Sequence, residues 1–104
     1  LSTAVHHKIN TITIIMNNKS WGAEKAYQRD FYNERYIGAD MISPPFHKLA
    51  EIYGAKGYHV SKLEDLKQAV SDALICDKPA IINIDVDPKA LYSFRKDSFK
   101  HRSK

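Results

Sequence analysis

The sequence is poor in cysteine and in long apolar runs, and each shortage excludes a class of protein. Cys76 is the only cysteine among the 104 residues, so an internal disulfide is impossible and a cysteine-based zinc site is not expected. The longest apolar stretches, at 12–16 and 80–86, are too short to cross a membrane. The first residues do not follow the pattern of a secretory signal. We therefore expect a cytoplasmic protein with no membrane partner.

Glycine is also scarce, and the charge is uneven. The four glycines form no phosphate-cradling loop, and no serine nucleophile motif is present. Sixteen Lys and Arg exceed twelve Asp and Glu, and the surplus lies largely in the last ten residues, 95–104. A basic tail of this kind is usually a solvated end, although phosphate or nucleic-acid binding is the sharper alternative. Because aromatic and basic residues are not interleaved, we expect no nucleic-acid partner.

Strands alternate with helices along most of the chain. The expected helices cover residues 1–8, 23–36, 44–53 and 61–74, and the expected strands cover residues 12–16, 57–60 and 80–86. Ser43–Pro44 and the pair Ser61 and Glu64 are typical of helix starts. The continuous β-branched run at 12–16 is typical of a central strand covered on both faces. The order predicts an α/β fold, a parallel sheet with helices on both faces, formed by residues 1–104 as one domain or part of one.

Ligands of open parallel sheets bind outside the carboxyl ends of the strands. Asn17 and Asn18 follow the first strand, and their side chains offer the neutral oxygens that suit magnesium. For a bare Asn-Asn pair a simple turn is the more common explanation. Among the other polar residues, His47 and His59 are expected to stand alone.

The wider segment raises the weight of the metal interpretation. An Asn-Asn pair after a hydrophobic strand, then Gly22, then Phe31–Tyr32, resembles the second half of the signature of thiamine-diphosphate (ThDP) enzymes. The resemblance extends over essentially the whole chain and implies the C-terminal portion of a ThDP-binding fold, with ThDP and Mg²⁺ as cofactors. It implies that Asn18 binds Mg²⁺ through its side chain and Ser20 through its backbone carbonyl.

The resemblance also assigns further residues to the cofactor site. Asn17 and Gly22 fall within the cofactor-binding segment, and Trp21 either lines the pocket or packs in the core. The Gly-Asp-Gly motif that opens the family signature is expected just upstream of Leu1. The family's activating glutamate belongs to a separate domain. We therefore expect the isolated chain to be inactive, to bind ThDP weakly or not at all, and to expose one edge of its sheet.

Within the family, three segments look most like sulfoacetaldehyde acetyltransferases: Trp21–Lys25, Asp30–Asn33 with Arg35, and Phe94–Asp97. The implied reaction converts sulfoacetaldehyde and phosphate to acetyl phosphate and sulfite, in a homodimer or homotetramer. Both substrates are anions, so Lys25, Arg29 and Arg35 are candidate substrate contacts, each with an exposed helix charge as the more common alternative.

Two other functions stay open at this stage. Acetolactate synthases share the Asn-Asn pair, the glycine and the Phe-Tyr pair, so a fragment of an acetolactate-synthase-like carboligase is the near alternative. A small α/β binding module that holds an acidic partner through its basic tail is the alternative from another class.

Overall fold

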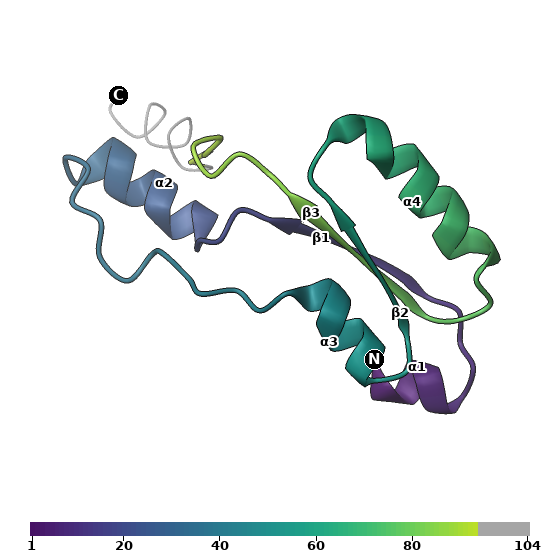
Figure 1. The fold of residues 1–104 in the computed structure, drawn as a ribbon. Coiled ribbons are helices and arrows are strands. Elements are labelled where there is room, and N and C mark those ends of the chain that lie inside the picture. Colours follow the sequence, from purple (N-terminus) through teal and green to yellow (C-terminus); the bar gives the residue numbers. More distant parts are fainter. Residues whose placement is uncertain (94–104) are drawn as a thin grey trace, which may run out of the picture. The chain divides into compact units, whose positions relative to one another are not determined.

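The computed structural model of the chain describes residues 1–93 (Figure 1). The basic tail at 95–104 and the segment Phe94–Asp97 lie outside the described residues. The described residues form two compact units, of which the first contains residues 1–17 and 43–86, and the second contains residues 18–42 and 87–93. In this part of the chain, no helix combines the length and apolarity that a membrane span requires.

The first unit is built on three parallel strands. They are β1 (Ile12–Asn17), β2 (Lys56–Val60) and β3 (Ala80–Asp85), in the order β1-β3-β2. Ile82 of β3 is in register with Ile14 on one side and with Tyr58 on the other. The parallel α/β architecture predicted from the sequence is therefore confirmed.

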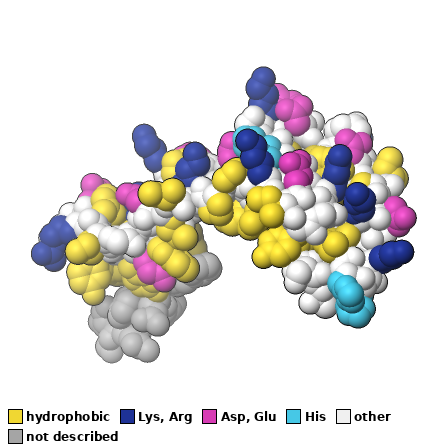
Figure 2. Space-filling model, turned by 60° about the horizontal axis from the view of Figure 1, so that its bottom comes forward, with side chains coloured by type: hydrophobic (Ala, Val, Ile, Leu, Met, Phe, Trp, Pro, Cys, Tyr) yellow, Lys and Arg dark blue, Asp and Glu magenta, His cyan; other side chains and the backbone are white. Residues whose placement is uncertain are grey.

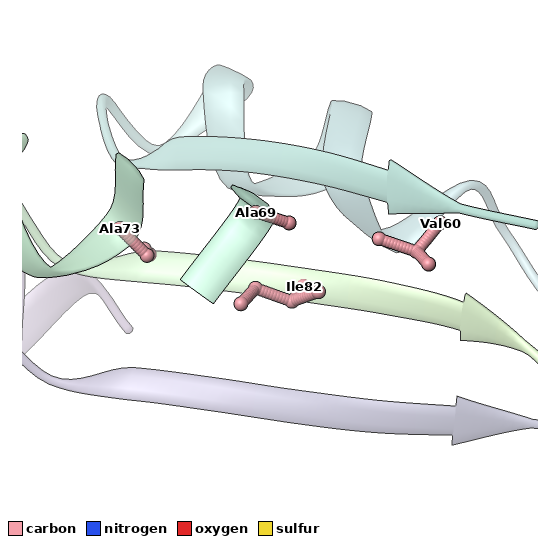
Figure 3. Packing of buried hydrophobic residues seen from close by; sticks show 5 residues of the cluster. Val60, Ala69, Ala73 and Ile82 are labelled. Carbon is pink, nitrogen blue, oxygen red and sulfur yellow. The ribbon is translucent and has the colours of Figure 1, made fainter. Parts of the chain in front are cut away.

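One face of the sheet is covered by α4 (Leu63–Ile75). Ala69 and Ala73 of this helix pack against Val60 and Ile82, and all four side chains are buried. Figure 3 shows the two alanines directed at the strands. The small alanine side chains let the helix backbone approach the sheet closely, and the larger branched residues of the strands fill the space between them.

The opposite face is covered by α3 (Phe46–Ile52) and α1 (Ser2–His6). Ile81 points to this side because side chains alternate along a strand. It packs with Ala50 of α3, and Val5 of α1 joins the same cluster. Helices thus lie on both faces of the sheet, as predicted, and Figure 1 shows α3 and α4 on opposite sides of the strands.

The central strand is β3, which corrects the expectation for the run at 12–16. Residues 80–83 are all buried, whereas β1 lies at the edge of the sheet. Ile14 of β1 is 49% exposed and Met16 is 72% exposed. A continuous apolar run indicates a strand, but the order of strands is set by which of them packs between the helices.

Three helix boundaries also differ from expectation. Helix α2 (Gly22–Phe31) ends five residues before Tyr36, because Asn33 and Glu34 adopt left-handed backbone angles that cannot continue a helix.

Helix α3 begins at Phe46 and not at Pro44. Pro44 precedes another proline, and a residue in that position is driven into extended conformations. Helix α4 begins at Leu63 without the expected side-chain cap from Ser61. Instead, Glu64 and Asp65 in its first turn stabilise the helix, because their negative charges lie at the positive end of the helix dipole.

Candidate functional site

The chain turns sharply immediately after β1. The side-chain oxygen Oδ1 of Asn18 accepts a hydrogen bond of 3.1 Å from the backbone N–H of Ser20. Lys19, between them, has a φ of 55°, in the left-handed region. Asn18 therefore forms a turn with its own backbone, as a bare Asn-Asn pair predicts. An amide oxygen has two lone pairs, so this bond leaves one acceptor position on Asn18 Oδ1.

The carbonyl of Ser20 is left without a backbone partner among the described residues. Ser20 lies opposite Asp40 in an isolated antiparallel bridge. The two hydrogen bonds of that bridge flank the pair. Trp21 N–H donates to Ala39 O at 2.7 Å, and Met41 N–H donates to Lys19 O at 2.9 Å. The bridge fixes the extended backbone at Ser20, and the carbonyl oxygen of Ser20 can still accept a hydrogen bond or bind a cation.

Gly22, the first residue of α2, leaves room for the side chain of Asn18. A Cβ atom at this position would lie 2.7 Å from Nδ2 of Asn18, closer than real Cβ contacts. The glycine therefore lets the amide of Asn18 occupy the start of the helix. The first N–H groups of any helix have no intrahelical acceptor and favour a negatively charged ligand. An amide oxygen, a carbonyl oxygen and a helix start thus occur within five residues of one another, all in the second unit.

Replacing Gly22 by alanine is expected to displace the Asn18 side chain with little loss of stability. The clash falls on the end of a flexible side chain, so the free energy of unfolding changes by about 1 kcal/mol or less, the value of the one hydrogen bond at stake. The ¹⁵N chemical shift of the Asn18 side-chain amide should move in Gly22→Ala and stay unchanged in the control Gly54→Ala. An unchanged Asn18 resonance in Gly22→Ala would contradict this account of the glycine.

Asn17 is turned toward the sheet. Its Nδ2 donates to Oδ1 of Asn83, a buried side chain on β3, at 3.4 Å. Its carbonyl accepts the N–H of Val86 at 3.2 Å. Both contacts lie within the first unit and join the ends of β1 and β3. The structure therefore gives Asn17 a role in holding the strand end.

Trp21 is 55% exposed and belongs to neither core cluster. In the part of the chain that the structure describes, Trp21 does not pack in a core, and its place in the cofactor pocket stays a prediction. Its indole is a large apolar surface at the start of α2, next to Gly22, where it is accessible to a ligand.

Two of the three candidate substrate cations are already paired. Lys25 Nζ lies 2.5 Å from Oδ1 of Asp40. Arg29 forms a fork to the carboxylate of Asp30, at 2.8 and 3.2 Å, and also donates to Leu91 O at 3.1 Å. The hydrogen bond to Asp30 raises the pKa of Arg29. Both cations hold the second unit together, and an anionic substrate would have to compete with carboxylates for them.

Arg35 is different. Its Nε donates to Tyr32 O at 3.1 Å, and no bond from its two terminal nitrogens was found within residues 1–93. Of the three predicted cations, Arg35 is the one without a carboxylate partner in the described part of the chain.

A polar group at the carboxyl end of the sheet was missed by sequence reasoning. Nε2 of His59 lies 2.8 Å from Oδ2 of Asp85, and the ring of His47 stacks on that of His59 with centroids 4.9 Å apart and planes 7° apart. The expectation that the two histidines stand alone was wrong. Side chains alternate along a strand, so the sequence could have placed His59 and Asp85 on the same face of the sheet as α3. The sequence does not give the register between β2 and β3, which decides that the two side chains meet.

The described residues contain no group of three or more His, Cys, Asp or Glu side chains arranged to hold a metal ion. Among the described residues, Oδ1 of Asn18 and the carbonyl oxygen of Ser20 are candidate neutral ligands for a cation. Magnesium accepts such ligands when phosphate oxygens complete its shell. The donors present fit a metal that arrives with a diphosphate.

These features define a class: an open parallel α/β domain with a polar loop directly after a strand, where domains of this class bind their ligands. The particular family follows from comparison. Residues 1–84 match the family model of the thiamine pyrophosphate enzyme, C-terminal TPP binding domain, and the chain belongs to this family. The family resemblance inferred from the Asn-Asn segment is thereby confirmed.

Individual relatives agree with this assignment. The chain is 33% identical to sulfoacetaldehyde acetyltransferase of Castellaniella defragrans over 102 residues, covering 94% of the chain and 17% of that protein. It is 34% identical to the mitochondrial acetolactate synthase catalytic subunit of Saccharomyces cerevisiae, over 86% of the chain and 13% of that protein. The chain thus spans about a sixth or less of the length of these relatives.

The fold also matches a solved structure. A thiamine diphosphate-dependent 4-hydroxybenzoylformate decarboxylase of Rhodococcus jostii superimposes with a TM-score of 0.75 at 31% identity, over 83% of the chain and 16% of that structure. Relatives with the same domain thus include an acetyltransferase, a synthase and a decarboxylase.

Proposed function

We propose that the chain supplies the diphosphate- and magnesium-binding part of a ThDP-dependent sulfoacetaldehyde acetyltransferase. The observation that carries the proposal is the 33% identity to sulfoacetaldehyde acetyltransferase, which runs over 94% of the chain and includes the loop after β1. In this proposal the complete protein converts sulfoacetaldehyde and phosphate to acetyl phosphate and sulfite as a homodimer or homotetramer.

Thiamine diphosphate, when bound, supplies the electron sink for such chemistry. The part of this chain is to hold the diphosphate end. Asn18 Oδ1 and the carbonyl of Ser20 would contribute two oxygens to Mg²⁺. The N–H groups at the start of α2 would face phosphate oxygens, whose negative charge the helix dipole favours. The left-handed Lys19 and the bridge at Ser20 fix the loop before the cofactor arrives, so little entropy is lost on binding.

The experiment uses the complete gene product, because the chain spans a small share of its relatives. Sulfite release from sulfoacetaldehyde is measured with and without phosphate, ThDP and Mg²⁺. We expect release that depends on all three and yields acetyl phosphate. Condensation of pyruvate in place of this reaction would overturn the proposed substrate and leave the ThDP assignment intact.

An acetolactate-synthase-like carboligase is the second candidate. It is supported by the 34% identity to the yeast acetolactate synthase subunit over 86% of the chain. The pyruvate arm of the same assay tests it directly.

The binding-module alternative depends on the basic tail at 95–104, which lies outside the described residues. On the face shown in Figure 2, basic side chains are interspersed with acidic and hydrophobic ones and form no continuous basic stripe. That face offers an acidic partner no concentrated positive field.

A further inference from the structure

A hollow in the second unit has the size of an organic-ligand site. Its volume is about 540 Å³. It is lined by Gln28 of α2, by Tyr32 directly after that helix, and by the loop residues Arg35, Tyr36 and Ile37. Sites for drug-sized organic molecules span roughly 300–1,000 Å³. A single water occupies about 30 Å³ in the liquid, so this hollow is much larger than phosphate or a two-carbon sulfonate requires.

The wall of the hollow is held by hydrogen bonds. The side chain of Gln28 donates to Ile37 O at 2.8 Å and accepts from Ile37 N–H at 3.3 Å. These two hydrogen bonds tie the loop back to α2. The left-handed residues Asn33 and Glu34 make the turn that brings the loop there. The hollow is thus shaped by local structure that exists without a ligand.

The lining combines aromatic surface with one cation. Tyr32 and Tyr36 contribute two rings and Ile37 an aliphatic group. Arg35 contributes a guanidinium whose Nε is bonded to Tyr32 O and whose terminal nitrogens have no bond within residues 1–93. A planar fork of N–H donors matches a carboxylate or sulfonate with two parallel hydrogen bonds. The rings match a flat apolar body, which stacks on them or meets them edge to face.

The neighbouring charges favour an anion at Arg35. Lys25, whose Nζ lies 5.3 Å from the Tyr36 ring centroid, is neutralised by Asp40. Arg29 is neutralised by Asp30. Glu34, the acidic residue next to Arg35 in the sequence, does not line the hollow.

We propose that this hollow binds an aromatic organic anion, with its carboxylate or sulfonate on Arg35 and its ring against Tyr32 and Tyr36. The proposal is independent of the reaction assigned above, since it rests on residues 28–37 alone.

The test is titration of the ¹⁵N-labelled chain with benzoate and benzenesulfonate, followed by amide chemical shifts. Benzamide serves as the neutral ring and sulfate as the anion without a ring. We expect the aromatic anions to shift residues 28–37 with dissociation constants near 1 mM, a weak affinity of about 4 kcal/mol. Benzamide and sulfate should each bind about tenfold more weakly.

Arg35→Gln should weaken benzoate about tenfold, and the control Lys67→Gln, an exposed cation on α4, less than twofold. Arg35→Lys keeps the charge without the fork and should weaken benzoate by an intermediate factor, which guards against a misfolded Gln variant. Unchanged shifts outside residues 22–42 verify the fold of each variant. Equal binding of benzamide and benzoate, equal binding of sulfate and benzoate, or no shift in residues 28–37 at about 10 mM probe would each overturn the proposal.

Discussion

Replacing Gly57 by alanine is expected to lower the free energy of unfolding by about 3 kcal/mol or more. A Cβ atom on this residue of β2 would lie 1.9 Å from the backbone carbonyl oxygen of His47 and 2.6 Å from its carbonyl carbon. These are backbone atoms of α3, which cannot rotate away as a side chain does. The helix would have to shift from the sheet, which disrupts the cluster around Ala50 and Ile81.

Thermal unfolding followed by circular dichroism measures this effect. For a domain of this size, 3 kcal/mol corresponds to a lowering of the melting temperature by roughly 12 °C or more. Gly38→Ala is the matched control: Gly38 has a φ of +62° but nothing within 4 Å of a Cβ. Its cost is the backbone strain alone, about 1 kcal/mol. Equal melting temperatures for the two variants would contradict the packing of α3 on β2.

Replacing Asn18 by alanine in the complete gene product is expected to weaken magnesium-dependent ThDP binding about 100-fold, or about 2.7 kcal/mol. The substitution removes one proposed magnesium ligand. It also removes the acceptor of the 3.1 Å hydrogen bond from Ser20 N–H, so the bridge with Asp40 alone is left to orient the carbonyl of Ser20. Loss of a ligand and loss of its neighbour's orientation both reduce metal affinity.

Calorimetric titration with ThDP, with and without Mg²⁺, provides the measurement. Asn18→Asp keeps an oxygen for both the turn and the metal and should retain affinity to within about tenfold. Asn10→Ala is the control, because the Asn10 amide is exposed and bonds only to Asp77 in the described part of the chain. Parent-like binding by Asn18→Ala would remove this residue from the site and, with it, the central element of the proposed function.

The secondary structure was largely predictable because its signals are local. The expected strands at 12–16, 57–60 and 80–86 correspond to β1, β2 and β3. The errors lie where local signals compete. Pro44 favours a helix start in isolation, but the second proline excludes it.

The candidate site was predictable in part. The turn at Asn18 follows from the preference of asparagine for bonds to its own backbone, and the bond to Ser20 confirms it. The sequence did not predict that Lys25 and Arg29 pair with carboxylates whereas Arg35 has no carboxylate partner in the described part of the chain. The contact between Lys25 and Asp40 spans fifteen positions and depends on how the loop returns to α2.

By itself, the sequence determined the elements, their parallel α/β arrangement and the family, because periodicity, turn chemistry and a spaced motif are properties of contiguous residues. Tertiary structure alone decided that β3 is the central strand, that His47 and His59 stack beside Asp85, and that Gly57 must remain a glycine. These features join segments distant along the chain. Their positions are set by the packing of α3 and α4 on opposite faces of the sheet, and no local pattern encodes that packing.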